Sequence, residues 1–159
     1  MQASLGLQVS VASQAPILAS QFSPAVTIKV SIENLAPSPV TVLKWGTPLD
    51  SRAGVLGIFE ICDTDNGQTL PTETIKISRK LPPSIEDLVE IPGGQTMDQL
   101  INLPGLQLEE GHHYSVHAQG IWHAVWDEPL ANVSVSQLQD LTGAKRGEFS
   151  SNTALLQVE

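Results

Sequence analysis

The four histidines are the residues of this chain best suited to chemistry, and all lie between Gly105 and Trp126. Zinc needs ligand atoms that converge about 2 Å from the ion. His113 and His117 would share one face of a strand but stand roughly 13 Å apart, and His112 would point to the opposite face. We therefore predict diverging imidazoles, with no bound metal or cofactor. A metal-dependent enzyme using His113, His117 and a carboxylate of a neighbouring strand is an alternative.

Other residues that could do chemistry have simpler interpretations. The segment DTDNG, Asp63–Gly67, resembles a calcium loop, but its glycine comes one place early and the twelfth position is Thr74 instead of glutamate. A hairpin turn fits better, because Asn-Gly tolerates positive φ. Cys62 lies in an apolar stretch that predicts a half-buried thiol. The pairs Glu109-Glu110 and Asp127-Glu128 are adjacent in sequence, and nothing places them across a cleft as acid and base. We expect no enzymatic activity.

The tryptophans and the segment KWGTPLD are the candidates for binding. Aromatic side chains can anchor a protein partner or stack against sugars. Trp126, in HAVWDEP, could be exposed in a loop beside an acidic rim that suits a protein interface. Each candidate also has a structural interpretation, in which Trp45 and Pro48 fix the loop to the core. The candidate binding residues are Trp45, Thr47, Pro48, Asp50, Trp122 and Trp126.

Composition limits the class of protein. The 159 residues, 41% of them hydrophobic, suit a single domain spanning residues 1–159. The net charge of −9 repels phosphate groups, so we expect neither nucleic acid nor a membrane as partner. The single cysteine excludes an internal disulfide. The first residues lack the basic region of a signal peptide, which predicts a cytoplasmic protein, or a secreted one if a signal has been removed.

Alternation of apolar and polar residues is the main structural signal, and it predicts half-buried antiparallel strands. Turn-forming segments such as APSP, IPGG and LTGAKRG separate these strands, and the last of them places Lys145-Arg146 in a solvated loop. One short helix is predicted after Pro82-Pro83, where Ser84 and Asp87 could form a capping box. About eight strands in one domain indicate two packed sheets. The expected strands are Leu5–Val11, Val26–Ile32, Val40–Trp45, Leu56–Cys62, Thr74–Ser78, Thr96–Leu103, Tyr114–Trp122 and Ala154–Val158.

The histidine-rich stretch itself carries a recognisable spacing. Leu108, Gly111 and Tyr114 follow the pattern L-x-x-G-x-x-Y of a tyrosine corner, in which the phenol bonds to the backbone just upstream. Gly111 would supply the positive φ of the turn. If Tyr114 opens a strand, Val116 faces the core beside it, and the odd-numbered residues from His113 onward face water.

Several stretches together resemble the N-terminal prodomain of fungal deuterolysin-type (aspzincin) metallopeptidases and stand-alone proteins of the same fold. The resemblance covers Leu5 to Glu159, and LKWGTPLD combined with SSNTALLQV is its most specific part. No peptidase domain or zinc-binding helix is present, so no catalytic residue of the family can be carried over. The matching pieces are VTIKVSIENLAPSPVTVLKWGTPLD, PGGQTMDQLINL, LQLEEGHHYSVHAQGIW and EFSSNTALLQVE.

The resemblance implies an all-β, antiparallel, immunoglobulin-like Greek-key sandwich of about seven to nine strands. The family's prodomains assist folding of an attached protease and keep it inactive. We therefore expect a non-catalytic domain that binds a protein partner, such as a protease, in an inhibitor-like or chaperone-like way. A carbohydrate-binding module that uses surface tryptophans is a second alternative. The sequence specifies no oligomeric state.

Overall fold

The chain folds into two antiparallel sheets packed face to face, as the computed structural model of residues 3–14, 17, 26–72, 74–156 and 158 shows. Short helices lie in the connections: η1 (Ala53–Val55), η2 (Ile85–Asp87), η3 (Leu130–Asn132) and α1 (Val135–Asp140). The strands are β1 (Ala3–Ser4), β2 (Leu7–Ser13), β3 (Val26–Asn34), β4 (Val40–Leu43), β5 (Phe59–Asp63), β6 (Gln68–Thr69), β7 (Leu88–Ile91), β8 (Thr96–Leu103), β9 (Tyr114–Trp126) and β10 (Lys145–Leu156).

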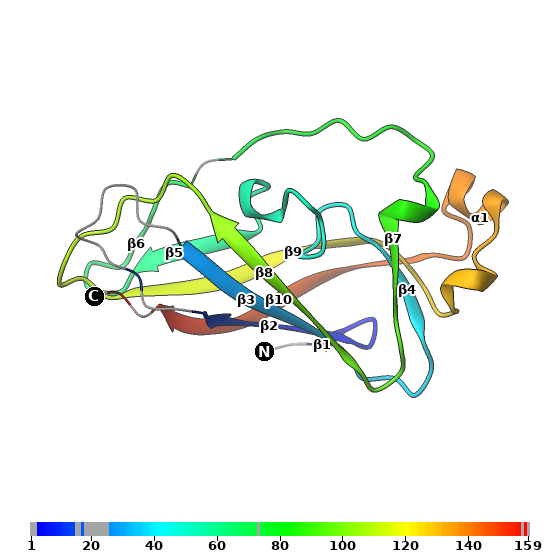
Figure 1. Ribbon diagram of the computed structural model, residues 1–159, viewed down its shortest axis with the longest axis horizontal. Coiled ribbons are helices and arrows are strands. Elements are labelled where there is room, and N and C mark those ends of the chain that lie inside the picture. Colours follow the sequence, from blue (N-terminus) through cyan, green and yellow to red (C-terminus); the bar gives the residue numbers. More distant parts are fainter. Residues whose placement is uncertain (1–2, 15–16, 18–25, 73, 157, 159) are drawn as a thin grey trace.

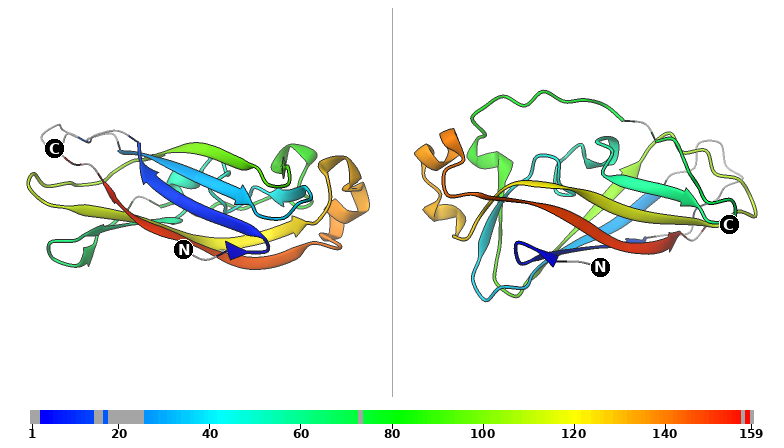
Figure 2. Two further views of the ribbon diagram at one scale, coloured as in Figure 1. Left: turned by 90° about the horizontal axis from the view of Figure 1, so that it is seen from below. Right: turned by 180° about the vertical axis from the view of Figure 1, so that it is seen from behind.

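One sheet has the strand order β1-β2-β3-β8, and the other has β6-β5-β9-β4-β7 with β10 paired to β9. Figure 1 shows β3 and β8 crossing β9 and β10 obliquely. Both views in Figure 2 place α1 at one end of the long axis and β6 toward the other. The prediction of an all-β antiparallel sandwich with a single short α-helix is confirmed for the described residues.

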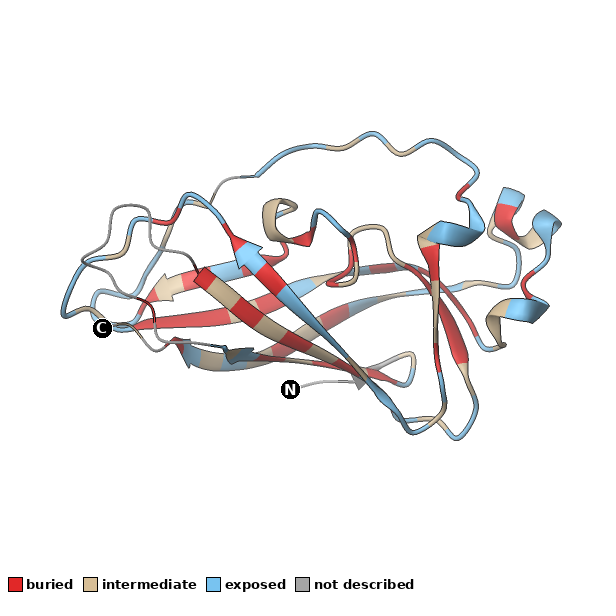
Figure 3. Cartoon of the chain, in the orientation of Figure 1, coloured by how far each residue is buried: buried red, intermediate tan, exposed pale blue. Residues whose placement is uncertain are grey.

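Alternating burial along β2 and β3 builds one half of the core. Val26, Ile28, Val30 and Ile32 are buried, and the residues between them face partly to solvent, as the banding of β3 in Figure 3 shows. Because successive side chains of a strand point to opposite faces, this period-two pattern leaves one apolar face for the second sheet. That face packs against residues of β9 such as Val116 and Trp122.

The two sheets are joined at one edge by the side chain of Asn152 in β10. Its amide oxygen accepts the Val11 N–H at 2.8 Å, and its amide nitrogen donates to the Val11 carbonyl at 3.1 Å. Asn152 lies at a β-bulge, where the pairing of β10 with β9 shifts between Ser150 and Thr153. At the same bulge the Ser151 hydroxyl accepts the Ala118 N–H of β9 at 2.8 Å, which leaves the Asn152 side chain to bond across to β2.

The predicted tyrosine corner is confirmed. The Tyr114 hydroxyl accepts the backbone N–H of Glu109 at 2.8 Å, and Tyr114 is 1% exposed. Gly111 has the expected positive φ of 81°. Tyr114 therefore fixes the start of β9, and Val116 is buried and Gln119 exposed as predicted, whereas Ser115, expected to face water, is buried.

A second bulge reverses the faces of β9 near its end. Val125 pairs with Lys145 and Trp122 pairs with Gly147, so His123 and Ala124 lie opposite the single residue Arg146. An extra residue on one strand shifts the alternation by one place. Trp122 consequently packs in the main core, and Trp126 packs on the opposite face in a second cluster with Leu43, Leu88 and Leu138.

Three local predictions are wrong. Residues 74–78 run extended but pair with no strand in the described structure. The capping box of Ser84 and Asp87 forms, yet it starts a single 3-10 turn followed by β7 instead of a helix. Lys145-Arg146 opens β10 and does not lie in a loop.

The α-helix α1 forms later in the chain, where Ser134 and Gln137 make a capping box that was not among the predicted ones. None of the helices in the described part of the chain is long and apolar enough to cross a membrane.

We predict that Tyr114→Phe lowers the free energy of unfolding by about 1–2 kcal/mol, because the Glu109 N–H loses its acceptor while the buried ring is kept. Urea denaturation of both proteins measures this difference. Exposed Ser136→Ala in α1 serves as a control with little expected effect. Equal stability of Tyr114→Phe and the wild type would show that the corner bond contributes nothing.

Candidate binding groove

A buried carboxylate organises the loop KWGTPLD that follows β4. Asp50 is 3% exposed and accepts the backbone N–H groups of Gly46, at 2.9 Å, and Arg52, at 3.0 Å. It also forms an ion pair with the guanidinium of Arg79. A buried carboxylate must be paired and hydrogen-bonded to be tolerated. The Asp50 carboxylate therefore ties the loop to the distant segment that carries Arg79.

Thr47 and Pro48 are buried inside the same loop. The Thr47 hydroxyl donates to the Lys44 carbonyl at 2.7 Å and accepts the Leu49 N–H at 3.1 Å. These bonds satisfy backbone groups that no ladder reaches. Thr47, Pro48 and Asp50 thus shape the loop from within and present no side chain to solvent.

The ring of Trp45 is held from two sides. The Arg79 guanidinium lies over the ring, 5.8 Å from its centroid, which is a cation–π distance. The indole also acts on the Asp87 carboxyl and helps to lower its pKa. Burial by itself would raise the pKa of Asp87, but hydrogen bonds from the Ser84 backbone and the Trp45 indole lower it below its usual 3.8. Trp45 is half-buried and keeps one part of its surface open.

Residues 74–81 form an extended strap above the sheet (Figure 1). The strap is fixed at one end by a hydrogen bond of 2.8 Å from the Ile75 N–H to the Val55 carbonyl, and near the other end by the ion pair of Arg79. Ile77 and Arg79 are half-buried, whereas Lys76, Ser78 and Lys80 are exposed. The alternation therefore turns one side of the strap toward the protein.

A groove of about 520 Å³ lies between the strap and β9. Its ionisable side chains are Arg79 and His123, and no carboxylate lines it among the described residues. Leu81 is 67% exposed and Ile121 is 36% exposed, so part of its apolar lining faces solvent. Concave sites with mostly apolar walls and a few polar groups are the usual binding sites of proteins. The apolar lining comes from Leu43, Trp45, Leu56, Ile58, Ile77, Leu81, Ile121 and Leu141.

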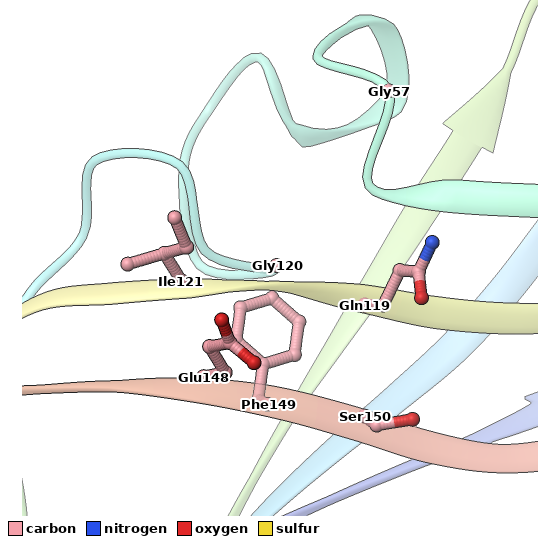
Figure 4. Close-up of a pocket in the computed structure, with 7 residues that line it drawn as sticks. All are labelled: Gly57, Gln119, Gly120, Ile121, Glu148, Phe149 and Ser150. Carbon is pink, nitrogen blue, oxygen red and sulfur yellow. The ribbon is translucent and has the colours of Figure 1, made fainter.

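Beside the groove, a second hollow of about 450 Å³ lies over β10, and the Glu148 carboxylate is among its lining side chains (Figure 4). In Figure 4 the Phe149 ring reaches from β10 toward Gly120, and Gly57 lies above β9. A Cβ on Gly120 would come within 2.7 Å of the Phe149 ring, so this position has no room for a side chain. Glycine at position 120 allows Phe149 to pack under β9, 4.8 Å from Trp122.

The structure brings one of the predicted binding residues, Trp45, to the groove and places the others in the interior. The prediction that Trp126 is exposed in a loop is wrong, because its side chain is fully buried and its indole donates to the Thr142 carbonyl at 2.9 Å. Trp122 is also fully buried. Neither ring can anchor a partner at the surface. The groove residues of the strap were missed, because their alternation was interpreted as a strand of the sheet.

The histidines do not gather around one point. His117 bonds to the Ser150 hydroxyl at 2.8 Å, and His123 lines the groove. His113 bonds to Asp65 at 3.1 Å. The alternative of a site built on His113 and His117 finds no support in this arrangement, since the two rings have different partners.

One expectation about the imidazoles needs correction. His112 and His113 were expected to diverge, yet both reach the DTDNG turn, where His112 contacts Asp63 at 2.6 Å. The other ring nitrogen of His112 lies 3.0 Å from Glu109. Asp63, Asp65 and His112 offer ligand atoms within 4.8 Å of one another, but these atoms already form hydrogen bonds and ion pairs. The His112 contacts join the tyrosine corner to the β5–β6 turn.

The charges of His112 and of the carboxylates Asp63 and Asp65 stabilise each other. The hydrogen bond to Asp63 raises the pKa of His112 above its usual 6.5, and the same bond lowers the pKa of Asp63 below its usual 3.8. The backbone N–H of His113 lowers the pKa of Asp65. His123 behaves oppositely, because burial first and the charge of Arg146 second lower its pKa.

The two packed antiparallel sheets and the tyrosine corner are the features of an immunoglobulin-like fold. The immunoglobulin-like domain family matches residues 13–158, and the chain belongs to that family. An uncharacterized secreted protein of Arthroderma benhamiae is 41% identical over 130 residues, which cover 79% of this chain and 66% of that protein. The chain thus spans just under two thirds of the length of this relative.

We predict that Trp126→Ala costs about 3–5 kcal/mol of stability, because a fully buried ring and its hydrogen bond are lost. Trp45→Ala should cost markedly less, since that ring is half-exposed. Chemical denaturation followed by circular dichroism measures both. An unchanged midpoint for Trp126→Ala would contradict the burial of this ring.

The pair of His112 and Asp63 predicts a pH-dependent stability. The raised pKa of His112 contributes stability below pH 6.5 that is lost as pH rises through its folded pKa. The lowered pKa of Asp63 contributes stability above pH 3.8 that is lost as pH falls. The gap in urea midpoint between wild type and His112→Gln should therefore be widest between these values, and it should shrink as pH rises through the folded pKa of His112 and as pH falls through that of Asp63. His113→Gln, at an exposed ring, is the control, and a gap independent of pH would contradict the assignment.

Proposed function

We propose that this protein is a non-catalytic binding domain that holds a segment of a protein partner in the groove under the strap. The observation that carries the proposal is the groove itself, with solvent-facing apolar residues such as Leu81 and Ile121 on a chain of net charge −9. Exposed apolar side chains beside a concavity are typical of interaction sites. The buried pairing of Asp50 and Arg79 would keep this site preorganised, which limits the entropy lost on binding.

We further propose a peptidase as the first partner to test. The support is the resemblance of LKWGTPLD and SSNTALLQV to deuterolysin prodomains, together with the role of the LKWGTPLD loop in building the groove. In such a complex the domain would act in an inhibitor-like or chaperone-like way. The match to the immunoglobulin-like domain family agrees with the fold expected from this resemblance, but it identifies no partner.

We also propose that the protein acts outside the cell. The support is the relative of Arthroderma benhamiae, which is named as a secreted protein. This proposal replaces the cytoplasmic expectation with the secreted alternative.

A carbohydrate-binding role has less support from the geometry. Sugar stacking needs an open aromatic face, and Trp122 and Trp126 are buried. Trp45 is half-buried, and the Arg79 guanidinium lies over its ring. A protein segment, which can use apolar walls without a flat aromatic platform, fits the groove better.

Affinity capture with matched variants tests the proposal. Wild type, Leu81→Ser and Leu155→Ser are used as baits in culture fluid and cell lysate of the organism that encodes the chain. Leu155 is 70% exposed on β10 and lies outside the groove, so it matches the exposed Leu81 in type and accessibility. We expect partners in the culture fluid that wild type and Leu155→Ser retain, and that Leu81→Ser retains at least roughly tenfold less.

Thermal melts of the three baits establish that all are folded. Identical capture by Leu81→Ser and wild type would show that the groove is not the binding site. Recovery of the partner from the lysate alone would overturn the extracellular assignment.

A further inference from the structure

We propose that the strap is a processing site: an endopeptidase specific for basic residues hydrolyses the bond between Lys76 and Ile77, and this cut weakens the groove. Water adds across the amide, so Lys76 gains a carboxylate and Ile77 gains an α-amino group, which is largely protonated at pH 7. The cleavage site does not depend on the proposed binding function, whereas its effect on the groove rests on that function.

The strap has the accessible backbone that an endopeptidase needs. A peptidase binds its substrate as an extended chain, so the bond must lie in a segment that is not held in a helix or sheet. Residues 74–81 belong to no helix or strand of the described structure, and Figure 1 shows them as an outer arc of the molecule. The hydrogen bond from the Ile75 N–H to the Val55 carbonyl is the one backbone hydrogen bond found between the strap and the rest of the described chain.

Basic side chains are concentrated in the strap. It holds three of the eight lysines and arginines of the chain. Most of the others lie in or beside regular structure. Lys29 lies in β3, which pairs on both of its edges, and Arg52 begins the 3-10 turn η1. The Lys44 N–H bonds to the Asp87 carbonyl at 2.8 Å. A peptidase with basic specificity therefore finds its accessible backbone in the strap.

The remaining pair, Lys145-Arg146, shows that an exposed side chain is not sufficient. The side chain of Lys145 is 59% exposed, but its backbone lies in β10 in register with Val125 of β9. This segment would have to leave the sheet to enter an active site, and such local unfolding costs free energy. The strap has to break a single backbone hydrogen bond at most.

Within the strap, Lys76 is the best placed of the three basic residues. The Arg79 side chain is paired with buried Asp50 and is not free to enter a peptidase pocket. Lys80 is followed closely by Pro82-Pro83, which lack the N–H groups that an extended substrate donates. Lys76 is exposed and has extended residues of the strap on both of its sides.

The cut leaves the sandwich assembled and changes the wall of the groove. It separates β1–β6 from β7–β10, yet β3 remains paired with β8, and β5 remains paired with β9. Ile77 is half-buried and lines the groove, so its new charged amino group stands beside an apolar wall. That charge has to be desolvated when a partner fills the groove, which opposes binding. Residues 77–81 also lose their link to the Ile75 hydrogen bond.

Limited digestion with trypsin, followed by mass spectrometry, tests the site. The first cut in the wild type should produce a fragment that begins at Ile77, and the two fragments should elute together in gel filtration. Lys76→Gln should lower the rate of the first cut at least roughly tenfold, because the remaining sites require local unfolding. Lys145→Gln is the matched control: it removes an exposed lysine whose backbone is paired, and it should be cut at the wild-type rate. Thermal melts establish that both variants are folded.

Incubation with culture fluid of the organism that encodes the chain tests for the peptidase itself. The same fragment should appear from the wild type and not from Lys76→Gln. A first cut at Lys80 or in β10, or culture fluid that leaves the bond after Lys76 intact, would overturn the processing site.

The effect on the groove is measured by affinity capture with the trypsin-cut protein as bait. We expect at least roughly tenfold less partner than with the intact protein, since a charge must be desolvated. Equal capture by cut and intact protein would overturn the effect on the groove. Absence of any partner on the intact protein would instead contradict the proposed function, and the digestion result would stand without it.

Discussion

The hydrogen bond from the Glu109 N–H to the Tyr114 hydroxyl fixes where β9 starts, and much of the sheet depends on that position. Because side chains alternate along a strand, a shift of one residue would exchange the buried and exposed sets. With Tyr114 in the core, Val116 and Trp122 also face inward, and the imidazole of His117 faces out. The groove, whose base is formed by the outer face of β9, is determined by the same register.

The ion pair of Asp50 and Arg79 fixes the wall of the groove, as the Tyr114 bond fixes the start of β9. It connects the loop after β4 to the strap, which pairs with no strand in the described structure. Removing only one member of such a pair leaves a buried charge without compensation, which is costly. The contact of Arg79 with Trp45 extends the same link to the wall of the groove. Shape and charge of the groove thus depend on the same few side chains.

Bulges explain why a single long strand can serve several neighbours. β9 pairs with β10 along one side, and on the other side it pairs first with β5 and then with β4. The bulge at His123 and Ala124 reverses the inward face, which lets Trp126 pack in a cluster separate from that of Trp122. β9 changes partners where the groove lies, since Gln119, Gly120 and Ile121 line it.

The sequence by itself determined the all-β class, most of the strands and the tyrosine corner, because these depend on local alternation and on a fixed local spacing. It also indicated that KWGTPLD is a special loop. It did not reveal that residues 74–81 remain outside the sheet, since an extended chain has the same alternation whether or not a neighbour pairs with it. The burial of Trp126 and the meeting of His112 with Asp63 were decided only by the tertiary structure. Both depend on a bulge or on contacts between segments far apart in sequence, and no local pattern encodes these.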